Sequence, residues 1–189
     1  MKETSACASQ RKNFGSGLLL LVAVWLGCPV MASAQTTHAH HHYQMGIRAY
    51  AGSRHAAILH HQAAQNKLLR SLALDNVSEM KTLAEKLVFY AKLISQIQSK
   101  AEQKAIGKEL SDMRALGKDA LQRSEVLWKL LHGATAEFAS PTDCRKIQEK
   151  AATVFARFQE LLLIHKRAEG TLGIVAAPEP KLPASAPTP

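Results

Sequence analysis

Histidine is the residue type in this sequence whose number and spacing could support chemistry. The chain of 189 residues has nine histidines, and four of them fall in the short tract from His38 to His42. Neutral imidazole is the commonest side-chain ligand of transition metals and suits Zn, Cu and Ni, and short His-rich tracts often bind such ions. The tract therefore predicts a metal site at His38, His40, His41 and His42. A solvated polar leader without a biological metal is the alternative.

His165 is the residue that we expect the rest of the chain to add to this site. It continues the apolar stripe of the last helical segment, near the end of that segment. In an up-down bundle the end of the fourth helix lies beside the start of the first, which brings His165 within reach of His41 or His42. A histidine at a helix C-terminus is also stabilised by the helix dipole, and this structural interpretation applies to His132 as well.

Three further histidines, His55, His60 and His61, cannot form a mononuclear site alone, because their spacings place them on different sides of a helix. His61 lies near the predicted apolar stripe of its segment, as do Arg54 and Gln65. Buried polar groups need partners. We therefore weigh an interior polar or metal site completed by other helices against boundary residues that are hydrogen-bonded at a groove.

The sequence contains no recognisable catalytic motif. It contains no Glu-x-x-His spacing of the kind that di-iron bundles use and no Cys-x-x-Cys-His motif for covalent haem. Neither a paired-carboxylate site nor a nucleophilic triad is recognisable. We expect a protein that is not an enzyme.

The first 34 residues are expected to be a cleaved signal peptide. Lys2, Arg11 and Lys12 form a basic n-region, and residues 18–27 form a short apolar h-region. The small-x-small motif Ala32-Ser33-Ala34 follows, which is the order that a signal peptide requires. The apolar run is shorter than the roughly 20 residues of a membrane span, and no later stretch qualifies. A lipoprotein modified at Cys28 and an uncleaved anchor are the alternatives. The motif predicts export to the periplasm or the medium.

Behind residue 34, apolar residues recur at helical spacings of three and four. Four segments are predicted, over about 44–73, 76–107, 108–132 and 140–170. Asn76 with Glu79 predicts the start of the second segment, Gly107 its end, and Ser140 the N-cap of the fourth. The expected core stripes are Ile47, Ala51, Ile58, Leu69 and Leu72; then Val77, Met80, Ala84, Leu87, Ala91, Ile94, Gln98, Ala101 and Ala105; then Leu110, Met113, Ala120, Leu127, Trp128 and Leu131; then Cys144, Ile147, Ala151, Val154, Phe155, Phe158, Leu161 and Leu162.

Short connections between these segments predict an all-α fold, an antiparallel up-down-up-down four-helix bundle over residues 44–170. The alternative is a long helical coiled-coil hairpin that oligomerises. Outside the bundle we expect a His-rich leader over 35–43 and a disordered Pro/Ala-rich tail over 171–189, because five of the last twelve residues are proline.

The net charge of +9 favours anionic surfaces or acidic partners, since an exported protein rarely meets nucleic acid. The alternative is a solvated basic face without a partner, because the basic residues are scattered along the predicted helices. The leading prediction is an exported, non-enzymatic helical bundle that binds Zn, Cu or Ni through its His-rich region. The competing prediction is a structural or interaction module that engages proteins of the cell envelope. Self-association is compatible with both predictions.

Overall fold

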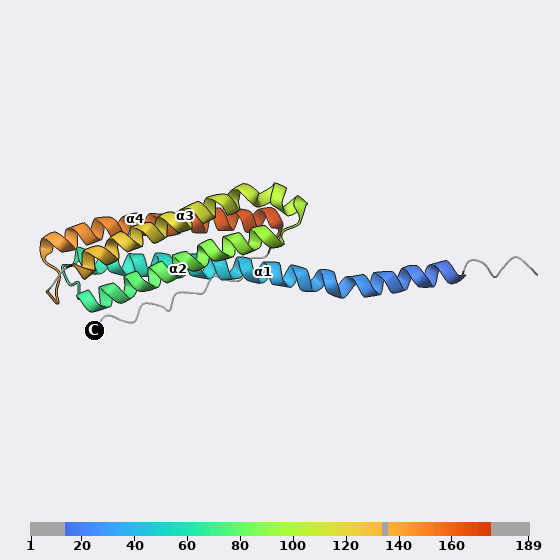
Figure 1. The fold of residues 1–189 in the computed structure, drawn as a ribbon, viewed down its shortest axis with the longest axis horizontal. Coiled ribbons are helices and arrows are strands. Elements are labelled where there is room, and N and C mark those ends of the chain that lie inside the picture. Colours follow the sequence, from blue (N-terminus) through green and yellow to red (C-terminus); the bar gives the residue numbers. More distant parts are fainter. Residues whose placement is uncertain (1–13, 134–135, 175–189) are drawn as a thin grey trace, which may run out of the picture. The chain divides into compact units, whose positions relative to one another are not determined.

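The structure is a computed structural model that describes residues 14–133 and 136–174, with side chains from His38 onward (Figure 1). It contains four helices: α1 (Phe14–Ala64), α2 (Arg70–Ile97), α3 (Lys100–His132) and α4 (Pro141–Leu172). The chain divides into two units, residues 1–38 and 39–189. Within the described ranges, no helix is both long enough and apolar enough to cross a membrane.

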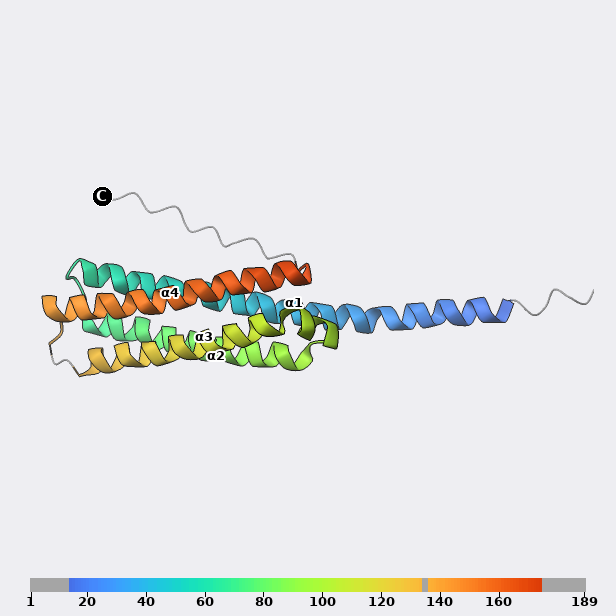
Figure 2. The same ribbon diagram turned by 90° about the horizontal axis from the view of Figure 1, so that it is seen from above.

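In the unit formed by residues 39–189, the four helices lie side by side with alternating direction (Figures 1 and 2). α3 packs against both α2 and α4. Side-chain hydrogen bonds connect α1 to its two neighbours. His55 Nδ1 lies 2.8 Å from Asn76 Oδ1 of α2, and Gln159 Nε2 of α4 donates to Ser53 Oγ at 2.5 Å. The predicted fold class, an all-α antiparallel four-helix bundle, is confirmed.

Helices α2, α3 and α4 bury most of the predicted stripes. Leucine, isoleucine, valine, methionine and alanine at heptad spacing form the core there, and the largest side chain in it is Phe158. Departures occur at the edges of the stripes. Trp128 and Leu162 are half-buried, Phe155 is exposed, and Ala101 and Ala105 lie on the exposed face of α3.

α1 buries the face opposite to the one that the sequence predicts. Ile47 and Ile58 are 39% and 36% exposed. The buried side consists mainly of small residues, with His42 and the large apolar Met45 and Leu59 among them. Its members include His42, Met45, Ala49, Gly52, Ser53, Ala56, Leu59 and Ala63. A Cβ at Gly52 would lie 2.3 Å from Cε1 of Phe158, so the aromatic ring fills the space that glycine leaves. The predicted stripe is wrong because close approach to α4, and not hydrophobicity, selects the buried face of α1.

Several predicted helix boundaries are also wrong. α1 ends at Ala64 and does not reach residue 73. α2 begins at Arg70, before Asn76, and it ends at Ile97. α3 then starts with a capping box in which Ser99 Oγ accepts from the Glu102 N–H at 3.3 Å and the Glu102 carboxylate accepts from the Ser99 N–H at 2.8 Å. Gly107 lies inside α3 and does not end a helix.

The start of α4 follows the prediction. Ser140 is the N-cap, and its Oγ accepts from the Asp143 N–H at 3.1 Å. The end of α4 comes slightly later than predicted, at Leu172, where Gly173 adopts a left-handed conformation with φ of 66°. Glycine is the residue best suited to this C-terminal position.

Two connections meet at one end of the bundle. Leu69, which precedes α2, forms an isolated antiparallel bridge with Phe138, which precedes α4. The neighbouring Arg70 guanidinium donates to the carbonyl oxygens of Leu131 and His132 at 2.6 and 2.8 Å. These are the last carbonyls of α3, where a cation is favourable. The connection between α1 and α2 is therefore hydrogen-bonded both to the residues that precede α4 and to the last turn of α3.

Candidate functional site

The predicted histidine tract is helical, because α1 continues through it. His38 and His42 are buried, His41 is half-buried and His40 is exposed. Since successive helical residues turn by about 100°, His38 and His42 lie one turn apart on the same buried face of α1, whereas the imidazoles of His40 and His41 point in other directions. The structure does not gather the tract into one cluster.

His42 and His165 are brought together. Their ring centroids are 5.7 Å apart, with 36° between the ring planes, and both side chains are buried. His165 Nε2 lies 2.8 Å from the carbonyl oxygen of His42, and this nitrogen donates because a carbonyl only accepts. The expected meeting of the end of α4 with the start of the first predicted segment is therefore found for this pair, although α1 itself begins earlier, at Phe14. His41 packs instead on Tyr90 of α2, with ring centroids 5.7 Å apart.

The ring of His165 is fitted closely against α1. A Cβ on Gly46 would lie 3.0 Å from His165 Cε1 and 3.3 Å from Nδ1. Gly46 follows His42 by one helical turn, so the glycine leaves room for the ring beside the His42 carbonyl. The position of His165 is consequently defined by α1 as well as by its own helix.

Glu169 completes this buried polar group, and the sequence analysis missed it. Its Oε2 lies 3.6 Å from His165 Nδ1, and the two residues are one turn apart on α4. Among the acidic side chains that the structure describes, that of Glu169 alone is buried. The signal that could have found it is its spacing of four from His165 on the same stripe.

Burial shifts the protonation of this group. Burial lowers the pKa of His165, and the hydrogen bond to the His42 carbonyl opposes that shift without reversing it. Burial raises the pKa of Glu169, and the nearby charge of Lys166 opposes this second shift. Loss of hydration disfavours the charged form of either residue. The end of the bundle near His165 therefore holds an imidazole that tends to be neutral.

The remaining histidines pair individually with other side chains. His55 contacts Asn76, His60 lies 3.5 Å from Gln148, and His61 lies 2.8 Å from Gln65. His132 stacks on Trp128 with ring centroids 4.4 Å apart. Arg54, His61 and Gln65 are all exposed. The interpretation of these three residues as an interior polar or metal site is therefore wrong.

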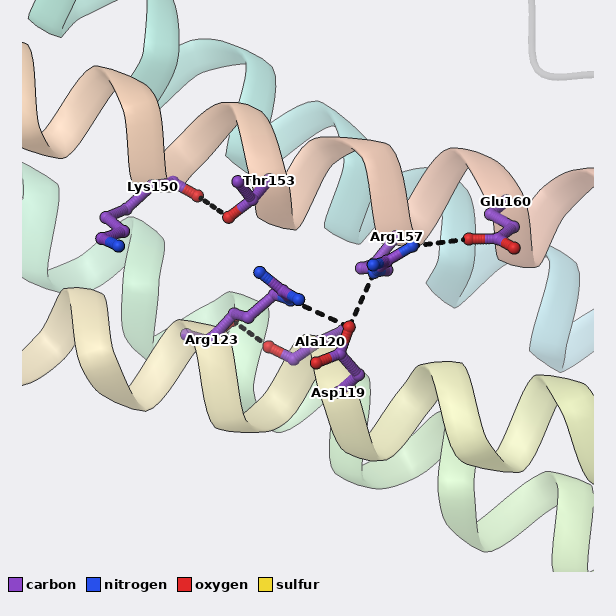
Figure 3. Close-up of polar contacts among 8 residues, drawn as sticks. Asp119, Ala120, Arg123, Lys150, Thr153, Arg157 and Glu160 are labelled. Carbon is purple, nitrogen blue, oxygen red and sulfur yellow. Dashed lines mark hydrogen bonds and ion pairs between the residues drawn. The ribbon is translucent and has the colours of Figure 1, made fainter.

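A second polar group lies on the surface between α3 and α4 (Figure 3). Asp119 accepts from Arg123 at 2.8 Å and from Arg157 at 2.6 Å, and Arg157 also pairs with Glu160 at 2.9 Å. Partial burial would raise the pKa of Asp119, but the hydrogen bonds and charges of the two arginines outweigh it and lower that pKa. The charges in this group compensate one another, so it connects two helices and offers no unbalanced charge to a ligand.

The chemistry available at the buried group is ligation by two imidazoles. In residues 38–133 and 136–174, no group of three or more His, Cys, Asp or Glu side chains is arranged to hold a metal ion. A metal at the His42–His165 pair would need water or backbone oxygens to complete its coordination. The chain matches no protein-family model, no curated protein and no solved structure.

Proposed function

We propose that the protein is an exported, non-enzymatic helical bundle that binds a transition metal ion through His42 and His165. The observation that carries the proposal is the meeting of these two imidazoles, 123 positions apart in the chain, at the buried contact between α1 and α4. Imidazole suits Zn, Cu and Ni, and facing helices of a bundle are a usual location for metal ligands.

The arrangement of His165 indicates which of its atoms would bind the metal. Nδ1 faces Glu169 and lies beside Gly46 of α1, whereas Nε2 faces the His42 carbonyl. Nε2 donates its proton to the His42 carbonyl, so the lone pair that a metal ion could bind is on Nδ1, which is the proposed ligand atom. Since burial lowers the pKa of His165, the imidazole is neutral at neutral pH, as ligation requires. Two protein ligands should hold the ion less tightly than the four of a structural zinc site.

The tract contributes to the proposed site through His42. His40 is exposed and His41 packs on Tyr90, so neither side chain is placed to share an ion with His165. This assignment is narrower than the five-histidine set that the sequence predicts.

Export is supported by the sequence alone, through the basic n-region, the apolar h-region and the motif Ala32-Ser33-Ala34. The intact mass of the protein recovered from the periplasm or the medium tests it. A mature chain that starts at Gln35 supports the proposal, and a chain that retains residues 1–34 contradicts it.

Metal titration tests the binding proposal. We would titrate Zn, Ni and Cu into the purified protein and into the variants His165→Gln and His42→Gln, and measure binding by calorimetry. The control is the double variant His60→Gln/His132→Gln, which removes two imidazoles elsewhere. Loss of binding in the first two variants with the control unchanged supports the proposal. A parent protein that binds nothing tighter than about 1 mM (about −4 kcal/mol) would contradict it.

A second candidate function, an interaction module of the cell envelope, is favoured by the outward face of α1. Tyr43, Ile47 and Ile58 are 36–44% exposed there. Exposed apolar side chains grouped on one face often mark interaction surfaces. The double variant Ile47→Gln/Ile58→Gln should release the protein from envelope fractions without changing metal affinity. Unchanged fractionation of this variant argues against the second candidate.

A further inference from the structure

We infer that α1 and α2 together form a docking surface for an anionic lipid bilayer. The surface, called the α1–α2 face below, is formed by the outward side chains of residues 41–54 of α1 and 86–97 of α2. The proposal rests on the second candidate function, for which it names the partner, and it is independent of metal binding.

Contacts around Tyr90 of α2 join the two helices at this face. The His41 ring lies 5.7 Å from the Tyr90 ring, and the Arg48 guanidinium lies over the same ring, 4.7 Å from its centroid. The Phe89 ring contacts it from α2, with ring centroids 5.5 Å apart. Because α1 and α2 lie side by side (Figures 1 and 2), the outward side chains next to these contacts belong to one surface.

Apolar side chains of both helices are exposed on the α1–α2 face. Tyr43 and Ile47, one turn apart on α1, are 44% and 39% exposed. On α2, Phe89 is 58% exposed. Ile97, which is 45% exposed, lies two turns after Tyr90 on the same side of α2. Exposed apolar side chains that gather in this way mark an interaction surface.

The charge of the same face selects an anionic partner. Neither of its two segments contains Asp or Glu. The lysines and arginines of these segments are Arg48, Arg54, Lys86 and Lys92. These cations attract phosphate headgroups, and they disfavour contact with a second copy of the same face, because that contact would bring like charges together.

A bilayer is favoured over an acidic protein because apolar and basic side chains alternate on the face. On α1, Arg48 directly follows Ile47, and on α2, Phe89 lies three residues from both Lys86 and Lys92. At a bilayer surface the apolar side chains enter the boundary of the acyl chains, while the long basic side chains keep their charges at the headgroups. A protein partner would need apolar and acidic side chains in the matching alternation.

Flotation of the protein with lipid vesicles tests this assignment. The vesicles contain phosphatidylglycerol and phosphatidylcholine in equal parts, and pure phosphatidylcholine vesicles are the reference. We expect binding to the anionic vesicles, and much weaker binding at about 1 M salt, where the Debye length is about 3 Å.

Two double variants separate the basic from the apolar contribution. Lys86→Gln/Lys92→Gln should weaken binding about 25-fold, since each cation near anionic lipid contributes about 1 kcal/mol, which is about 5-fold in affinity. Ile47→Gln/Phe89→Gln should weaken binding about 10-fold or more, because these side chains would no longer leave water. Circular dichroism checks that the variants, all at the surface, keep their helices.

The matched controls change the same kinds of residue elsewhere on the bundle. Lys104→Gln/Lys108→Gln alters exposed lysines of α3. Val126→Gln/Leu163→Gln alters side chains of α3 and α4 that are 47% and 64% exposed. Both controls should bind vesicles as the unaltered protein does. Since all variants have the same residues before His38, that part of the chain contributes equally to each measurement.

Three results overturn the lipid assignment: no binding to anionic vesicles, equal binding to phosphatidylcholine, or losses in the α1–α2 face no larger than those of the controls. If vesicles are not bound but Ile47→Gln/Ile58→Gln still releases the protein from envelope fractions, the partner is an envelope protein and the second candidate function stands. If that release fails as well, the second candidate function falls with the lipid assignment. The metal proposal is decided separately, by its own titration.

Discussion

The ring of Phe158 occupies the position where a side chain on residue 52 would begin, since a Cβ built on Gly52 lies 2.3 Å from Cε1 and 2.4 Å from Cζ of that ring. Phe158 is fully buried, so a side chain at position 52 would force the ring to shift within the core. Glycine at position 52 is thus what allows α1 and α4 to approach at the centre of the bundle.

Gly52→Ala should therefore destabilise the protein. Overpacking a core costs about 1–3 kcal/mol, which exceeds the helix-propensity gain of roughly 0.5–1 kcal/mol. Urea unfolding followed by circular dichroism measures the change. The matched control is Gly107→Ala, whose Cβ would meet only Gln103 Cγ, at 3.7 Å, so that the propensity gain stabilises this variant. Equal stability of the two variants would show that Phe158 does not constrain position 52.

Arg70→Met should destabilise the bundle by about 1.5–3 kcal/mol, the range for hydrogen bonds to a charged group. The guanidinium donates to two terminal carbonyls of α3, at Leu131 and His132, and methionine keeps much of the side-chain length without the donors. Thermal unfolding of this variant, compared with Arg114→Met at an exposed position of the same bundle, provides the measurement. A loss no larger than that of the control would argue that the two contacts contribute nothing.

Ser99→Ala should cost about 1 kcal/mol, because it removes an N-cap. Ser99 Oγ accepts from the backbone of Glu102 at the start of α3. Ser111→Ala is the control, since Ser111 is exposed in the interior of the same helix and alanine is the better helix former. Denaturant midpoints of the two variants should move in opposite directions, and a shift of Ser99→Ala in the stabilising direction contradicts the assigned cap.

Acidification should destabilise the metal-free protein through His165. Burial lowers the pKa of this histidine in the folded state, so the unfolded chain takes up the proton at a higher pH than the folded protein does. The stabilising contribution is complete above the unfolded pKa of about 6.5 and is lost as pH falls through the lower folded value. We expect the free energy of unfolding to decrease from pH 8 to pH 5, a range that includes the ordinary histidine pKa of about 6.5. The variant His165→Gln should show a smaller decrease.

Two other groups change stability in separate ways. The lowered pKa of Asp119 gives a contribution that is lost only below the usual carboxyl range, near about 3.9. The raised pKa of Glu169 has the opposite sign, because its stabilising contribution is lost as pH rises through the folded value. A decrease between pH 8 and 5 that persists in His165→Gln would show that His165 is not its cause.

The sequence was sufficient to predict the helix count, the antiparallel order and the core of α2, α3 and α4. In those helices most of the buried residues are aliphatic and most of their neighbours are polar, so periodicity and burial agree. In α1 they disagree. Its buried face contains Gly52, Ser53 and Ala56, which carry little hydropathy signal, while Ile47 and Ile58 face outward. For such a helix, a prediction from hydropathy assigns the wrong face to the core.

The candidate site was predictable in part for a related reason. His165 lay on a stripe that the sequence identifies, and the antiparallel order placed it beside the start of the first predicted segment, next to His42. Which tract residue it meets depends on the rotation of α1, which hydropathy did not reveal. Glu169 was missed because an acid near a helix end is usually exposed, and its burial follows only from packing.

The bridge between Leu69 and Phe138 and the hydrogen bonds from Arg70 to the end of α3 connect segments that lie far apart in the sequence. At that end the two helical hairpins, α1–α2 and α3–α4, are held together without a covalent link between them. At the opposite end, Gln98 and Ser99 alone join α2 to α3. A chain cut between these two residues would consist of two hairpins with complementary faces. Mixed as separate peptides, the halves should reassemble into a nicked bundle and regain cooperative unfolding that neither half shows alone.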